Sequence, residues 1–372
     1  MALFTPVKEI VARFITLLLL ALWGYQWLVE KKPLVKTTLY LPLLLLILYQ
    51  ALSLTWAHNP YQGFEHWLHW FSLAAFFFVC LNLSDDRFQI QKIMKFSLFP
   101  AILVCVISLI CSLFHTDLPF FPKRDFWWAT KFGNYKFAGE YIAPLIFWAL
   151  ALFSIESQNK KRIFYLCIAV GLFLSLIFLF KSRASLIAVF MLLPPSFLMV
   201  SIFSPFLRKL FSRLKKSHRS QRNVFLSLTA IGLLALLLLW VVAPTIFERG
   251  HTTNLQRSII WKNTISLIQD HPWLGVGIGN FNLTYPFYTL PKDRFLIPET
   301  SYWDDIVRQT HNEYLQLFSE LGLPGFLLCL VIFLIVCKNC YRYLRTPFVF
   351  FLFLSFLCHA IIALFVFNFQ NA

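Results

Sequence analysis

Residues 162–204 read RIFYLCIAVGLFLSLIFLFKSRASLIAVFMLLPPSFLMVSIFS, and this stretch decides the fold. It holds two apolar runs, 162–181 and 184–204, separated by almost no loop. Each run is close to the roughly 20 residues that a helix needs to cross a membrane. The stretch therefore predicts two consecutive transmembrane helices joined by a tight turn that contains Lys181, Ser182 and Arg183.

The same kind of apolar run recurs along the whole chain. The other candidates are 11–29, 37–56, 65–82, 93–114, 137–155, 223–243, 321–337 and 346–367. The 372-residue chain is 59% hydrophobic and 13% charged, whereas soluble domains are about 45–50% apolar and about 25% charged. The composition excludes a soluble or disordered protein. It predicts an all-α integral membrane protein, a polytopic bundle of about 10–12 transmembrane helices.

The basic charge of the chain indicates orientation rather than nucleic-acid binding. The net charge is +16, but no basic stripe lies along a polar helix face. Cytoplasmic loops of membrane proteins collect Lys and Arg, and 205–222 is the most basic loop. With this loop in the cytoplasm, the 181–183 turn and the long 244–320 segment lie outside. Lys8 and Arg13 then lie outside as well, which the rule disfavours, so residues 1–29 hold either one helix or two.

Three regions are expected from this topology. Residues 1–243 form eight transmembrane helices, 244–320 form a large outer loop with short helices, and 321–372 form the C-terminal helices. None of the eight cysteines falls in the outer loop, so no disulfide framework is expected there. Cys337 and Cys340 form a CxxC that lacks a second pair of ligands, which is a weak metal signal.

Two cations in the short turn have two interpretations. Charges at membrane depth are costly and by default indicate a functional site, which favours a role for Lys181 and Arg183. The alternative is that both side chains anchor the helices by extending their charged ends to the membrane surface.

The outer segment begins with a helical pattern from Leu255, which carries Arg257 near its start and Trp261 one turn later. Asp270-His271-Pro272 ends this helix. Gly275, Gly277 and Gly279 predict a tight turn, because no buried strand precedes them as in a dinucleotide-binding loop. The aromatic stretch 281–305 reads as a loop, and its rings suit either an interfacial belt or stacking on sugars.

A second outer helix is expected to start at His311, with Leu315, Phe318 and Leu321 on one face. Gly322 and Gly325 are expected to break it before the next span. A histidine at such a boundary is often simply solvated, but imidazole is also the natural base near neutral pH.

Arg183, Arg257 and His311 all fall on the outer side in this topology, and together they suit one kind of chemistry. Guanidinium groups bind a diphosphate through paired hydrogen bonds. A histidine can remove the proton of an attacking hydroxyl. Neither paired histidines nor clustered carboxylates accompany them, since neighbours such as Asp304 and Asp305 face apart. No metal and no cofactor are therefore expected.

Four patterns together carry a family resemblance. They are Arg257 with Trp261 four residues later, HPWLGVGIGNF at 271–281, His311-Asn312 followed after nine residues by Gly322-Leu-Pro-Gly325, and Ser182-Arg183 between two helices. This combination resembles the O-antigen ligase and polymerase superfamily. Weaker echoes are WAHNP at 56–60 and FGNYKFAGEYIA at 132–143.

The resemblance implies metal-independent glycosyl transfer from an undecaprenyl-diphosphate-linked glycan to a sugar hydroxyl of lipid A–core. It places the protein in the bacterial inner membrane, with the active site facing the periplasm and substrates embedded in lipid. By this resemblance His311 activates the acceptor, and Arg183, Arg257 and Lys181 bind the diphosphate. Supporting roles fall to Asn312, Gly322, Gly325 and Trp261.

Three alternatives stay open at this point. An O-antigen polymerase uses the same donor with a second carrier-linked glycan as acceptor. A protein O-oligosaccharyltransferase of the same superfamily acts on protein. A transporter is less favoured, because its charges would lie near the membrane midplane and its sequence would often show inverted repeats.

Overall fold

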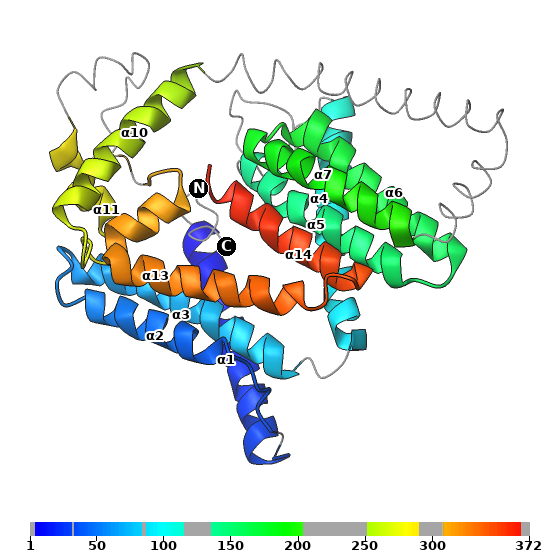
Figure 1. Cartoon of the computed structure of the whole chain (residues 1–372), viewed down its shortest axis with the longest axis horizontal. Coiled ribbons are helices and arrows are strands. Elements are labelled where there is room, and N and C mark those ends of the chain that lie inside the picture. Colours follow the sequence, from blue (N-terminus) through cyan, green and yellow to red (C-terminus); the bar gives the residue numbers. More distant parts are fainter. Residues whose placement is uncertain are drawn as a thin grey trace. The chain divides into compact units, whose positions relative to one another are not determined.

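A computed structural model describes residues 4–31, 33–83, 87–114, 135–203, 251–289, 307 and 309–365. Every regular element in these ranges is a helix (Figure 1). The elements are α1 (Phe4–Leu28), α2 (Tyr40–Ser53), α3 (Pro60–Leu83), α4 (Arg87–Phe114), α5 (Tyr135–Ile155), α6 (Asn159–Ser175), the π-helix η1 (Leu176–Phe180), α7 (Arg183–Phe203), α10 (His251–Asp270), α11 (Phe281–Thr284), the 3-10 helix η3 (Tyr285–Tyr288), α13 (Glu313–Tyr341) and α14 (Pro347–Ile362).

The predicted all-α membrane architecture is confirmed. Within the described ranges, five helices are long and apolar enough to cross a membrane: Pro60–Asn82, Phe88–Ile110, Ala138–Ile155, Asn159–Phe180 and Glu313–Tyr341. Shorter apolar helices cover Arg13–Leu28, Tyr40–Ser53, Arg183–Phe197 and Pro347–Ile362. Together they match all expected spans except 223–243, which lies outside the described residues together with the basic 205–222 loop.

The chain divides into two compact units. The first combines Met1–Ile93 with Arg257–Lys338, and the second combines Met94–Gln256 with Asn339–Asn368. In the second unit, α5 packs against α6, α7 and α14. The side chains of Ala143, Phe147 and Ala151 follow one another at four-residue steps along α5 and are fully buried. The small residues let the neighbouring helices approach closely, as in other membrane bundles.

The core of the first unit joins the beginning of the chain to its C-terminal half. Leu46 of α2 and Leu321 of α13 are buried around Ile278, which belongs to the turn after α10. Trp67 and Trp70 of α3 pack against this cluster from a third side. The indole nitrogen of Trp67 also donates a hydrogen bond of 3.0 Å to the backbone oxygen of Ile47.

The turn 275–279 connects this core to a second one. Val276 is buried with Ile260 and Leu267 of α10 and with Phe281 and Tyr285. Val276 and Ile278 thus enter two different clusters. Gly275 lies close to the backbone of α13, Gly277 lies close to the backbone at 53–57, and Gly279 lies close to the side chain of His66. Full burial of side chains of this size contributes about 1.5–3 kcal/mol each. The turn is therefore a packed element that holds α10 against α13.

The structure corrects several predicted boundaries. The first outer helix begins at His251 rather than near Leu255, so Arg257 lies inside α10. The expected loop after Asn280 instead forms α11 and η3, because Phe281 and Tyr285 lie four residues apart and enter the same buried cluster. The rest of the aromatic stretch, including Asp304 and Asp305, lies outside the described residues.

Candidate active site

Asn312 sets the first residue of α13. Its side-chain oxygen accepts hydrogen bonds from the backbone nitrogens of Tyr314 at 3.0 Å and Leu315 at 3.1 Å. This is the usual arrangement of an N-cap residue, and such a cap contributes about 1 kcal/mol. The helix consequently begins at Glu313 and not at the predicted His311. His311 lies immediately before the cap, where its ring is not confined to a helical face.

His311 has a left-handed backbone, with a φ of 54°. A residue with a Cβ atom in this conformation costs on the order of 1–3 kcal/mol, and the conformation persists only where its surroundings enforce it. Thr310, which is fully buried, supplies much of this constraint. Its hydroxyl donates to the Asn312 backbone oxygen at 2.6 Å and accepts from the Asn312 backbone nitrogen at 3.1 Å. The half-buried His311 is therefore held at a fixed place in the chain.

Trp261 connects α10 to the residues around His311. Its indole nitrogen donates a hydrogen bond of 2.9 Å to the backbone oxygen of Thr310. Arg257 is half-buried and lies four residues earlier, so it shares the face of α10 that carries Trp261. The fold thus turns the Arg257 face of α10 toward the segment that carries His311.

The kink of α13 explains why two predicted glycines have different roles. Gly322 has a φ of 62° and a ψ of −166°, which interrupts the helix as expected. Gly325 was expected to break the helix too, but that prediction is wrong, since Gly322 is the residue with non-helical angles inside α13. An ideal Cβ on Gly325 would meet the side chain of Leu321, so its small size serves packing within the helix.

The carbonyl groups released by this kink bind the 271–277 segment. Pro324 has no N–H to donate to the oxygen of Glu320, and Gly277 donates to it instead at 2.9 Å. The Ser319 oxygen likewise accepts from Val276 at 3.0 Å. Leu323, whose nitrogen would otherwise bind Ser319, donates to the Pro272 oxygen at 2.9 Å. The backbone exchange satisfies buried polar groups on both segments.

Residues from the first half of the chain form hydrogen bonds with the turn that follows α10. Asn59, in the weak WAHNP echo, donates its backbone nitrogen to the Asn280 side-chain oxygen at 2.7 Å. Asn280 returns a hydrogen bond from its side-chain nitrogen to the Asn59 backbone oxygen at 3.3 Å. The Gln62 amide donates to the Gly279 oxygen at 2.9 Å, and the Ile278 nitrogen donates to the Ser53 hydroxyl at 3.1 Å.

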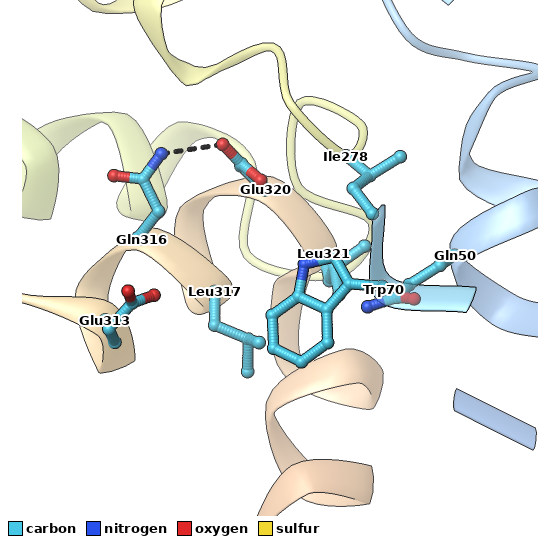
Figure 2. Close-up of a pocket in the computed structure, with 8 residues that line it drawn as sticks. All are labelled: Gln50, Trp70, Ile278, Glu313, Gln316, Leu317, Glu320 and Leu321. Atoms are coloured by element: carbon cyan, nitrogen blue, oxygen red, sulfur yellow. Dashed lines mark hydrogen bonds between the residues drawn. The ribbon is translucent and has the colours of Figure 1, made fainter. Parts of the chain in front are cut away.

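The sequence patterns did not single out Gln316 and Glu320, two buried residues of α13. The Gln316 amide oxygen accepts from the Thr310 nitrogen at 2.8 Å, and its amide nitrogen donates to Glu320 at 2.7 Å (Figure 2). The second carboxylate oxygen of Glu320 accepts from the Gly279 nitrogen at 2.9 Å. The sequence did carry a signal, since Asn312, Gln316 and Glu320 recur at four-residue steps and form a polar stripe along a mainly apolar segment.

At the other end of α10, Asp270 holds the short aromatic helices. The Tyr288 hydroxyl donates a hydrogen bond of 2.9 Å to its carboxylate. Burial raises the pKa of Tyr288 to about 12, and the hydrogen bond and negative charge of Asp270 act in the same direction. Tyr288 therefore stays a neutral donor at physiological pH.

The second unit holds the other two predicted ligands. Lys181 ends η1 in a left-handed conformation with a φ of 47°, and Arg183 begins α7. Ser182 between them is buried and accepts a hydrogen bond of 3.0 Å from the Ser185 hydroxyl. Gly139, in the second weak sequence echo, lies against this turn, since an ideal Cβ there would be 2.8 Å from the Ser182 Cβ. The approach of Lys181 and Arg183 to His311 stays a prediction.

Within the ranges that the structure describes, no group of three or more His, Cys, Asp or Glu residues could hold a metal ion.

These features define a polytopic membrane protein with a constrained histidine at the start of a kinked helix. A family model described as O-antigen ligase matches residues 145–330, which is half of the chain and includes every candidate from Lys181 to Gly325. The chain belongs to the O-antigen ligase superfamily, and this membership indicates a glycosyltransferase-type enzyme. No curated protein matches the chain.

Proposed function

We propose that this chain moves an O-antigen glycan from undecaprenyl diphosphate to a sugar hydroxyl of lipid A–core. The reaction takes place at the periplasmic face of the bacterial inner membrane. The observation that carries the proposal is the left-handed His311, held between Thr310 and the N-cap Asn312 within the region matched by the family model. Strained residues of this kind cluster at active sites, where the surrounding structure maintains them.

In the proposed reaction, the His311 imidazole takes the proton of the acceptor hydroxyl. The acceptor oxygen forms a bond to the anomeric carbon of the donor glycan while the bond from that carbon to the diphosphate oxygen breaks. The electron pair of the broken bond remains on the diphosphate. A positioned general base of this type contributes about 10²- to 10⁴-fold in rate.

Negative charge develops on the departing diphosphate, and cationic side chains stabilise it. Arg257 is the candidate in the first unit, because it lies one turn from Trp261 on the face that is bonded to the His311 segment. Arg183 and Lys181 are the candidates in the second unit. A guanidinium group binds phosphate oxygens through two parallel hydrogen bonds, which an ammonium group cannot reproduce. In this proposal these cations provide the charge stabilisation without a metal.

A gel of lipopolysaccharide from cells that lack this gene tests the acceptor. Loss of O-antigen from lipid A–core, with long polymer retained on the polyprenyl carrier, is the expected result. A core capped by a single repeat unit would instead identify a polymerase. An unchanged ladder would contradict both and direct attention to protein glycosylation or transport.

A direct assay tests the chemistry itself. The purified full-length protein in lipid nanodiscs would receive carrier-linked glycan and lipid A–core, and the joined product would be followed with time. The His311→Ala variant is expected to insert normally and to form no product.

A further inference from the structure

A small cavity lies inside the first unit, beside the polar stripe of α13. Its lining comes from α2, α3, α13 and the 275–279 turn, and consists of Gln50, Trp70, Ile278, Glu313, Gln316, Leu317, Glu320 and Leu321 (Figure 2). The volume open to the centre of a water molecule is about 10 Å³. A single buried water needs about 10–15 Å³ by this measure. The cavity thus has the size of one small polar ligand.

Gln50 shows what chemistry the cavity requires. The residue is completely buried, and neither its amide oxygen nor its amide nitrogen has a hydrogen-bond partner within the protein. Figure 2 shows this amide turned toward the ring of Trp70 at the edge of the cavity. More than about 90% of buried polar groups are paired. A buried amide left unpaired is destabilising, so a partner in the cavity would be strongly favoured.

The opposite wall offers hydrogen-bond acceptors. Glu313 and Glu320 are both buried and lie seven residues apart on the same side of α13. The Glu320 carboxylate accepts hydrogen bonds from Gln316 and Gly279, and the backbone N–H of Phe281 and the ring of His66 also interact with it. The two oxygens of a carboxylate offer about four lone-pair sites, so Glu320 can still accept one further hydrogen bond.

We propose that this cavity binds one ordered water molecule, which links Gln50 of α2 to the buried carboxylates of α13. The water accepts a hydrogen bond from the Gln50 amide nitrogen and donates its own protons to acceptor oxygens of the lining. A metal cation would suit the carboxylates but would leave the Gln50 N–H group without an acceptor. Water both donates and accepts, so it fits the amide and the carboxylates together.

The bound water extends a chain of hydrogen bonds toward the proposed base. Glu320 is bonded to Gln316, and Gln316 is bonded to Thr310, which directly precedes His311. Gln50 is consequently a positioning residue that acts on His311 through the water and α13. This last step rests on the proposed function, whereas the water site itself does not.

A high-resolution map of the full-length protein in nanodiscs tests the site. The expected result is a density peak about 2.7–3.2 Å from the Gln50 amide nitrogen and from a glutamate oxygen. The peak should vanish in Gln50→Leu and persist in Leu48→Met, a control on the exposed side of the same helix. Absence of the peak in the unaltered protein would overturn the proposal. A peak that requires sodium ions, with oxygen neighbours closer than hydrogen-bond distance, would overturn it by identifying a cation.

Kinetics test the positioning role separately. Gln50→Leu is expected to lower kcat about tenfold with little change in KM for the donor, because the base is displaced while the diphosphate contacts remain. Leu48→Met should keep the unaltered kcat. Loss of the peak with an unchanged kcat would overturn the link to His311. If the unaltered protein forms no product, the proposed function fails, but the map still decides whether the water is bound.

Discussion

The indole nitrogen of Trp261 donates a 2.9 Å hydrogen bond to the backbone oxygen of Thr310, the residue that precedes His311. The two residues are 49 positions apart, so this bond joins α10 to the start of α13 across the whole intervening segment. The Thr310 nitrogen is bonded to Gln316 on its other side. Both polar backbone groups of Thr310 are therefore occupied, which fixes the peptide from which His311 emerges.

Replacement of Trp261 by phenylalanine should keep the ring packing and remove this hydrogen bond. The Thr310 oxygen would then lose a buried partner, at a cost of about 1–3 kcal/mol. We expect kcat to fall about tenfold and the melting temperature to decrease. Trp273→Phe is a matched control, because that side chain is 68% exposed. Equal activity of the two variants would show that the Trp261 bond does not position His311.

The left-handed backbone of His311 predicts an unusual order of stability among inactive variants. Alanine and glycine both remove the imidazole, so neither His311→Ala nor His311→Gly should transfer glycan. Glycine adopts a φ of 54° without the penalty that a Cβ atom brings, which is roughly 1–2 kcal/mol. Thermal unfolding in detergent should therefore show His311→Gly to be the more stable of the two. The reverse order would contradict the left-handed conformation.

The helices were predictable because transmembrane runs are local features of a sequence. Each needs only length and apolar composition, and all expected spans within the described ranges are present. Part of the site was local as well: the Gly322 kink and the tight turn at Gly275, Gly277 and Gly279 appear where glycine patterns predict them. The start of α13 was misplaced by two residues, since the cap depends on the side-chain geometry of Asn312.

Contacts between distant segments could not be predicted from one sequence. The Asn59 and Asn280 pair spans 221 positions, and the Gln50 cavity combines α2 with α13. Such pairs depend on how apolar helices pack, and a single chain carries no local pattern for that. The same reason explains why WAHNP gave only a weak signal, although its Asn59 is hydrogen-bonded to Asn280 and its Trp56 to Leu274.

Alanine substitutions at three glycines should separate close packing from ordinary helix propensity. At Gly275 and Gly322, the φ values are 65° and 62°, and an added Cβ would lie within 2.8 Å of backbone atoms of the opposing segment. An ideal Cβ on Gly171 in α6 would meet no heavy atom within 4 Å beyond the adjoining residues and backbone of its own helix. We expect both Gly275→Ala and Gly322→Ala to lower the melting temperature. Gly171→Ala should leave it unchanged or raise it, because alanine favours helix by about 0.5–1 kcal/mol over glycine.

The 271–277 segment and the kink of α13 exchange backbone hydrogen bonds, so variants at Gly275 and Gly322 should affect stability together. Gly275→Ala and Gly322→Ala disturb the same contact, so their effects on unfolding free energy should not add. The double variant should be less destabilised than the sum of the single ones. Simple additivity would show that the two glycines act independently, contrary to the contact between the 271–277 segment and the kink.

Chelation tests the proposed metal-free chemistry. In the proposed mechanism the cationic side chains alone stabilise the diphosphate, so EDTA should leave the rate of glycan transfer by the purified protein unchanged. The assay should include a dialysed sample and a sample to which Mg²⁺ is returned. Inhibition by EDTA that Mg²⁺ restores would contradict the mechanism.

Arg183 tests whether the 181–183 turn belongs to the active site. Arg183→Lys keeps the positive charge and the start of α7, but it loses the planar group that binds two phosphate oxygens at once. Loss of one charge-assisted hydrogen bond costs about 1.5–3 kcal/mol, so kcat/KM should fall about 10- to 100-fold. Arg162→Lys is a suitable control, because Arg162 lies at the other end of the α6–η1 segment, over the ring of Phe153. A membrane anchor needs only a long side chain with a charged end, and lysine satisfies that requirement. An unchanged rate in Arg183→Lys would therefore assign Arg183 to the membrane surface, while a selective loss would place it on the diphosphate.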